Sequence, residues 1–142
     1  MVKRPSSITW QCRTCSLKLE EKTRVMGVLN VTPDSFSDGG HFNNFERARE
    51  RAFQLQEDGA DIIDIGGEST RPGSDPLSLQ EELDRVIPVI ESLNELLIPI
   101  SIDTYKADVA KAAIKTDAAI INYINAATFN PAIPQLMAQT RS

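Results

Sequence analysis

The sequence predicts an α/β fold of the TIM-type (β/α)8-barrel class, present as about four βα units behind an N-terminal β-hairpin. Short apolar stretches of strand length alternate with helical stretches four times in succession. The first two strand-to-helix connections are long and rich in Gly and Pro, whereas the helix-to-strand connections at 58–59 and 97–99 are tight. Barrels lengthen the loops beyond the carboxyl ends of their strands in this way.

The first elements are a hairpin and one βα unit. Residues 8–20 carry β-branched and aromatic residues in loose alternation, which predicts the hairpin, and the mostly apolar stretch 24–29 predicts the first buried strand. A long polar loop follows. We expect Asn44 to cap the first helix and Gly59 to end it as a C′ glycine.

The second unit begins with a strand at 61–65 and continues, after a Gly/Pro loop, with a helix over 78–97. Ser78 and Glu81 form an S-x-x-E capping box at the start of this helix. Pro88 lies inside the helix and lacks a backbone donor, so we expect a kink or a break there.

The third unit combines a strand at 99–103 with a short Ala-rich helix at 106–115. The fourth has a strand at 118–124 and a weak helix at 132–138. Strands that alternate with helices in this way form a parallel sheet covered by helices.

An open doubly wound sheet is the competing architecture. No G-x-G-x-x-G follows a strand and GGEST is not a P-loop, which favours the barrel. A barrel typically needs about 250 residues, so we expect this chain not to close alone. The predicted organisation is one partial domain over 1–142, with the hairpin at 8–20, the βα units at 24–125 and a divergent tail at 126–142.

Composition favours an enzyme that acts on small molecules. The net charge of -5 argues against a nucleic acid or an anionic membrane as partner. No apolar run approaches the length of a membrane span, and no apolar segment follows the basic N-terminal residues. We therefore expect a cytoplasmic protein.

Cys12 and Cys15 form a C-x-x-C within the predicted hairpin. A tetrahedral zinc site needs two more ligands, and His41 is the sole histidine. A redox motif belongs at a helix start after a strand. We therefore interpret Cys12 and Cys15 as two small apolar residues that pack within the hairpin.

Polar residues stand at the ends of the four predicted strands: Asn30, Asp64, Asp103 and Asn122. Any one of them could simply cap a helix, but four in register favour a ligand site. Asp103 could accept hydrogen bonds from adjacent N–H groups of a planar ring, and Asn122 offers both a donor and an acceptor to such a heterocycle.

Two further groups suit a phosphorylated ligand. Thr70 and Arg71 supply a hydroxyl and a guanidinium in the loop after the second strand, and Arg can grip phosphate oxygens at two points. Asn30 could coordinate Mg²⁺ through its amide oxygen, together with phosphate oxygens and water.

Two long strings make a family resemblance specific. VMGVLNVTPDSFSDGG at 25–40 resembles the first signature of dihydropteroate synthases, and GADIIDIGGESTRPG at 59–73 resembles the second. ISIDTYKADVAKAAI and AAIIN resemble the third and fourth units, so the likeness covers roughly residues 8–125. The resemblance implies a (β/α)8 barrel, commonly homodimeric, of which this chain is the N-terminal half.

The resemblance also implies roles for individual residues. Asn30 would bind Mg²⁺ and diphosphate, and Thr70 and Arg71 the diphosphate. Asp103 and Asn122 would bind the pterin. Asp64 would support the pterin pocket. Phe36, Asp38 and Pro72 would close over 4-aminobenzoate, where sulfonamides compete.

The implied reaction expels Mg²⁺-bound diphosphate from a hydroxymethyl-dihydropterin diphosphate, and the arylamine attacks the resulting cation. Arg71, Asp103 and Asp64 would carry the catalysis. Family members usually have Asn-Asp where this chain has Asn122–Tyr123. The alternatives are an inactive half-barrel, a pterin-binding methyltransferase barrel and an open-sheet phosphate-binding module.

Overall fold

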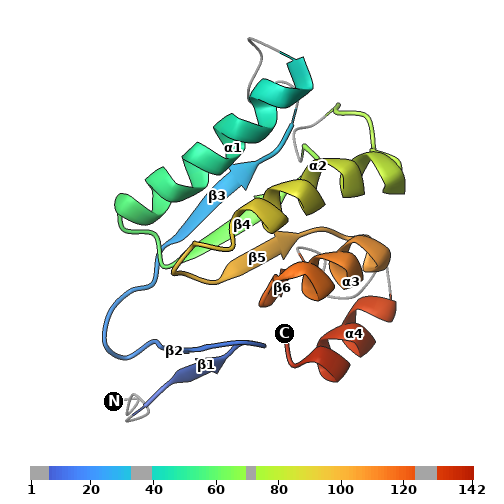
Figure 1. Ribbon diagram of the computed structural model, residues 1–142. Coiled ribbons are helices and arrows are strands. Elements are labelled where there is room, and N and C mark those ends of the chain that lie inside the picture. Colours follow the sequence, from blue (N-terminus) through green and yellow to red (C-terminus); the bar gives the residue numbers. More distant parts are fainter. Residues whose placement is uncertain (1–6, 33–39, 70–72, 124–130) are drawn as a thin grey trace.

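Four parallel strands form the central sheet of the computed structural model, which describes residues 7–32, 40–69, 73–123 and 131–142 (Figure 1). Their order in the sheet follows the chain, as in a barrel, whereas a doubly wound sheet reverses its order at a switch point. The predicted barrel topology is thereby confirmed. The strands are β3 (Met26–Asn30), β4 (Ile62–Gly66), β5 (Ile100–Asp103) and β6 (Ile120–Asn122).

Within the described residues, four helices accompany the strands, and consecutive helices contact one another. None of those in the described part of the chain combines the length and hydrophobicity that a bilayer crossing requires. They are α1 (Gly40–Glu57), α2 (Leu79–Ser92), α3 (Ala107–Thr116) and α4 (Ala132–Thr140).

Helix α1 begins earlier than predicted. The expectation that Asn44 caps it was wrong, since the helical backbone starts at Gly40 and Asn44 lies inside the first turns. The polar character of this stretch of sequence suggested a loop. Residues 41–43 contain no proline, however, so their backbone can be helical. Gly59 follows the helix with φ +103°, as predicted for a C′ glycine.

Helix α2 has the predicted capping box but a different end. The Ser78 side chain accepts a hydrogen bond from the Glu81 N–H, and the Glu81 carboxylate accepts one from the Ser78 N–H. Of the kink or break expected at Pro88, the break was wrong, because the helix continues to Ser92; Pro88 lies on its exposed side. The helix ends before Leu97, since the chain turns over 93–95 to reach β5.

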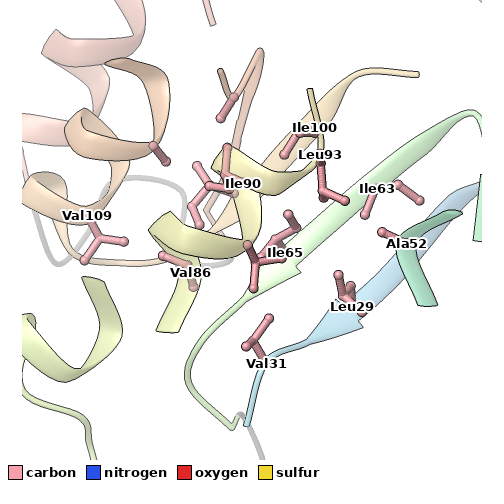
Figure 2. Packing of buried hydrophobic residues seen from close by; sticks show 14 of the residues in the cluster. Leu29, Val31, Ala52, Ile63, Ile65, Val86, Ile90, Leu93, Ile100 and Val109 are labelled. Carbon is pink, nitrogen blue, oxygen red and sulfur yellow. The ribbon is translucent and has the colours of Figure 1, made fainter. Parts of the chain in front are cut away.

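The main core lies between the sheet and the helices (Figure 2). Leu29, Ile65 and Ile102 occupy one row across the strands and are almost fully buried. Val86 and Ile90 of α2 pack in the same cluster. Because these side chains face the helices, the residues that alternate with them along each strand face the other side of the sheet. That side is the inner face of the partial barrel.

The predicted hairpin is present as β1 (Thr9–Gln11) and β2 (Ser16–Lys18), paired antiparallel. It lies near the amino ends of the strands (Figure 1). There Cys12 packs in a small cluster with Ile62 and Ile120, whose side chains belong to the inner face. Burial, and next the neighbouring Cys15, raise the pKa of Cys12 to about 11. The thiolate is thus disfavoured, in keeping with a packing role.

Candidate functional site

The carboxyl ends of the strands bring predicted site residues into one row. Asn30 pairs with Gly66, Gly66 with Asp103, and Asp103 with Asn122 in the parallel register. Residues paired in this way direct their side chains to the same face of the sheet. The row therefore presents two amides and one carboxyl on the inner face.

Asp64 lies two residues before Gly66, on the same inner face, and only 4% of it is exposed. The Asn122 Nδ2 donates a hydrogen bond to Asp64 Oδ2 at 2.9 Å. Ser101 of β5 lies beside Asp64 in the parallel register. Within the described residues, Asp64 Oδ1 and Ser101 Oγ are both buried and form no hydrogen bond. Unsatisfied buried polar atoms are costly, so this part of the face is suited to a polar ligand.

The surroundings of Asp103 oppose its negative charge. Burial, followed by the charges of Asp64 and Glu82, raises the pKa of Asp103 to about 6. Donors that approach this carboxyl would reverse the shift, because hydrogen bonds to a carboxylate favour its charged form. The group is prepared to bind a ligand that carries N–H donors.

Gly66 leaves space between Asn30 and Asp103. A Cβ at position 66 would stand 3.7 Å from Asn30 Oδ1 and 3.7 Å from Asp103 Cβ. Any longer side chain would extend into the region between the two polar groups. The glycine thus keeps the centre of the row open.

A second polar cluster lies behind this row, where the β4–α2 and β5–α3 connections meet. Lys106 Nζ is 2.7 Å from Glu68 Oε2 and 2.6 Å from Glu82 Oε2. The Tyr105 hydroxyl donates to the Glu68 carboxylate at 3.0 Å. The cluster ties the loop after β4 to α2 and to the start of α3.

The structure does not describe every residue that the sequence singles out. Outside the described residues lie Phe36, Asp38, Thr70, Arg71 and Pro72.

Sequence reasoning missed Ser101 and the Glu68–Lys106–Glu82 cluster. Ser101 could have been found, since it precedes Asp103 by two residues and so shares its face of the strand. The cluster could not, because Glu68 and Lys106 are 38 positions apart and no local pattern links them.

Comparison with known proteins agrees with this geometry. The model of a family described as "Pterin binding enzyme" matches residues 26–142. The chain belongs to this pterin-binding enzyme family. Its curated relatives include the dihydropteroate synthases of Bacillus subtilis, 54% identical over 125 residues, and of Synechocystis, 53% identical over 123 residues. These alignments cover 87% and 86% of this chain but 44% and 43% of the relatives.

Solved structures of this pterin-binding family share the fold. The dihydropteroate synthase of Xanthomonas albilineans with 4-aminobenzoic acid has a TM-score of 0.87 and 44% identity, over 96% of this chain and 50% of that one. The Burkholderia cenocepacia dihydropteroate synthase complexed with 7,8-dihydropteroate has a TM-score of 0.75 and 44% identity, over 89% and 41%. The chain thus spans about half the length of the relatives it matches.

Proposed function

We propose that this chain provides the pterin-binding part of a dihydropteroate synthase. Such an enzyme condenses 6-hydroxymethyl-7,8-dihydropterin diphosphate with 4-aminobenzoate, giving 7,8-dihydropteroate and diphosphate for folate synthesis. Because the chain spans about half the length of its relatives, the proposal assigns it ligand binding. We expect the 142 residues alone to show no appreciable turnover.

The observation that carries the proposal is the group formed by Asp64, Asp103 and Asn122. The edge of a pterin ring offers adjacent N–H donors and a ring-nitrogen acceptor. Burial and the charges of Asp64 and Glu82 disfavour the Asp103 carboxylate, which therefore gains from such donors, while the Asn122 amide can both donate and accept. Asp64 holds the Asn122 amide and keeps one oxygen available.

The proposed reaction requires few groups from the protein. The bond between the exocyclic methylene carbon and the diphosphate oxygen breaks, and the electron pair leaves with the diphosphate. The amine nitrogen of 4-aminobenzoate then bonds to that carbon and loses a proton. Thr70 and Arg71 would neutralise the departing charge, and Phe36, Asp38 and Pro72 would enclose the arylamine.

Mg²⁺ fits the residues present. No group of three or more His, Cys, Asp or Glu side chains forms a metal site within the described residues. Asn30, however, is exposed beside the space that Gly66 leaves open, and one protein oxygen with phosphate and water oxygens is a ligand set that Mg²⁺ accepts. When bound, the ion would stabilise charge on the diphosphate.

Sulfonamides would compete for the 4-aminobenzoate position under the same proposal. A Yersinia pestis dihydropteroate synthase has been solved in a sulfonamide drug complex. A homodimer is a further expectation from the family resemblance, and sedimentation of the purified chain would test it.

Titration of pterin fluorescence with the purified chain tests the binding site. Asp103→Asn and Asn122→Ala should each weaken binding of hydroxymethylpterin by roughly tenfold or more, the effect of losing a hydrogen bond to a charged or buried group. Asp108→Asn is the control, since this exposed residue of α3 lies outside the row. Unchanged affinity in both site variants would refute the proposal.

An assay of dihydropteroate formation with both substrates and Mg²⁺ tests the expectation about turnover. Product formed by the 142-residue chain at ordinary enzyme rates, about 1 s⁻¹ or faster, would contradict it.

A further inference from the structure

A second row of side chains lies beneath the row of polar strand ends, one step closer to the amino ends of the strands. The parallel register pairs Val28 with Asp64, Asp64 with Ser101, and Ser101 with Ile120. Each of these residues stands two positions before a member of the upper row, so it faces the same side of its strand. This lower row has apolar ends and a polar centre, which consists of Asp64 and Ser101.

The polar centre of the lower row is buried and only partly hydrogen-bonded. Ser101 is 0% exposed, and its Oγ finds no hydrogen-bond partner in the part of the chain that the structure describes. Asp64 accepts a hydrogen bond from Asn122 at Oδ2, whereas its Oδ1 has no partner among the same residues. A hydroxyl can donate and a carboxylate oxygen accepts. The lower row therefore offers one donor and one acceptor side by side.

Apolar residues separate this pair from the amino ends of the strands. Ile62 stands two positions before Asp64 on the same face, and it packs with Ile120 and the hairpin residue Cys12 in one buried cluster. On the other side of the pair lies the row of polar strand ends, where Gly66 carries no side chain. A ligand group that satisfies the pair would therefore approach from the carboxyl ends.

A serine at position 101 is costly for the fold unless a ligand binds its hydroxyl. Burial of a hydroxyl without a partner destabilises a folded chain, and an alanine would occupy the same position without a polar atom. Departures from a well-satisfied interior are expected at functional sites. The burial of Ser101 beside a second unsatisfied atom is thus typical of a binding position.

We propose that Ser101 is a ligand-binding residue of the pterin site. Its hydroxyl donates a hydrogen bond to an acceptor on the inner edge of the ring, and Asp64 Oδ1 accepts one from the adjacent N–H. The inference rests on the proposed function and extends it by specifying the ligand class, a heterocycle in which an N–H donor lies next to a ring-nitrogen or carbonyl acceptor. Asp103 and Asn122 would contact the same ring one layer above.

Ser101→Ala separates ligand binding from stability. The variant lacks the donor, so hydroxymethylpterin should bind about tenfold more weakly. Because the same change removes an unsatisfied buried group, the midpoint of urea unfolding should stay equal to that of the parent or rise. A hydroxyl that only holds a structural water would give the opposite result, a lower midpoint with unchanged affinity.

Ser101→Thr should give the reverse pattern. The hydroxyl is retained, so the affinity for hydroxymethylpterin should stay close to that of the parent. The added methyl group enters a fully buried position and should lower the urea midpoint. Ser92→Ala is the control for loss of a hydroxyl, because Ser92 donates to the Val89 carbonyl at the end of α2 and its loss should leave the affinity unchanged.

Fluorescence titration with hydroxymethylpterin and urea unfolding followed by circular dichroism measure the two quantities on the purified chain. If Ser101→Ala binds within about twofold of the parent, or binds more weakly with a lowered midpoint, the inference is wrong. A parent chain that binds no hydroxymethylpterin gives a different result, since it refutes the proposed function and the inference with it.

Discussion

Two aspartates at opposite ends of the parallel strands show how strongly neighbouring groups determine the pKa of a carboxyl. Asp61 precedes β4 and accepts hydrogen bonds from Lys22 and from the Val25 N–H, which lower its pKa to about 2. Asp103 ends β5, where burial and then the charges of Asp64 and Glu82 raise its pKa to about 6. The charged form of Asp61 is stabilised by hydrogen bonds from the protein, whereas the charged form of Asp103 would be stabilised by donors of a ligand.

We expect Asp103→Asn to stabilise the chain at neutral pH. The pKa of about 6 exceeds the ordinary value of 3.8, so the folded state retains a proton that the unfolded state releases between about pH 4 and 6. The carboxyl therefore destabilises the fold progressively as pH rises through this window. With allowance for solvent screening of a partly exposed group, the gain at pH 7 should be about 1 kcal/mol.

Urea unfolding of both proteins between pH 3 and pH 8 measures this effect. The two free energies of unfolding should converge below about pH 4 and differ above about pH 6. Equal stability of Asp103→Asn and the parent at pH 7 would show that folding does not raise the pKa of Asp103.

Among the elements, α2 depends on both its N-terminal cap and its contact with the loop after β4. Gly67 allows the close approach of the helix, since a Cβ there would lie 2.9 Å from Val86 Cγ1. The Arg85 Nη1 donates to the Gly67 carbonyl at 3.1 Å. The capping box at Ser78 fixes where the helix begins, and so fixes Glu82 opposite Lys106.

Ser78→Ala should lower the free energy of unfolding by about 1 kcal/mol, because the Glu81 N–H loses its acceptor. Thermal or urea unfolding followed by circular dichroism measures the loss. Ser92→Ala at the last residue of α2 is the control, since its hydroxyl donates to the Val89 carbonyl within the helix and caps no N–H at the helix start. A loss no larger than that of the control would exclude a stabilising cap.

For the molecule as a whole, the inner face of the sheet is unevenly covered. The hairpin packs over Ile62 and Ile120, but Met26 and Val28 of β3 are 36% and 59% exposed. Among the described residues, β3 pairs on one side only, with β4. An apolar face beside an unpaired strand favours association with other chains.

We expect the purified 142-residue chain to self-associate with rising concentration, and Val28→Lys to reduce this association. A lysine at an edge strand opposes pairing through its charge. Leu97→Lys is the control, because Leu97 is 88% exposed in the turn between α2 and β5, away from β3. Sedimentation velocity over a range of concentrations measures the effect, and a parent chain that stays monomeric throughout would contradict it.

Much of the fold follows from local patterns in the sequence. Alternation of apolar strands and helices predicts the βα units, Ser78 and Glu81 predict the start of α2, and Gly59 predicts the end of α1. Each pattern depends on contacts between residues a few positions apart, which a sequence displays directly. The start of α1 and the possible break of α2 at Pro88 were mispredicted, since polarity and proline are weak guides once packing stabilises a helix.

Some features of the candidate site can likewise be predicted from the sequence, and others only from the folded structure. Strand ends mark Asn30, Asp64, Asp103 and Asn122 as polar residues of one edge, because parallel strands align their carboxyl ends. The bond between Asp64 and Asn122 spans 58 positions, and the raised pKa of Asp103 and the cluster around Lys106 likewise depend on distant groups. Burial and long-range neighbours exist only once the chain is packed, so only the folded structure reveals them.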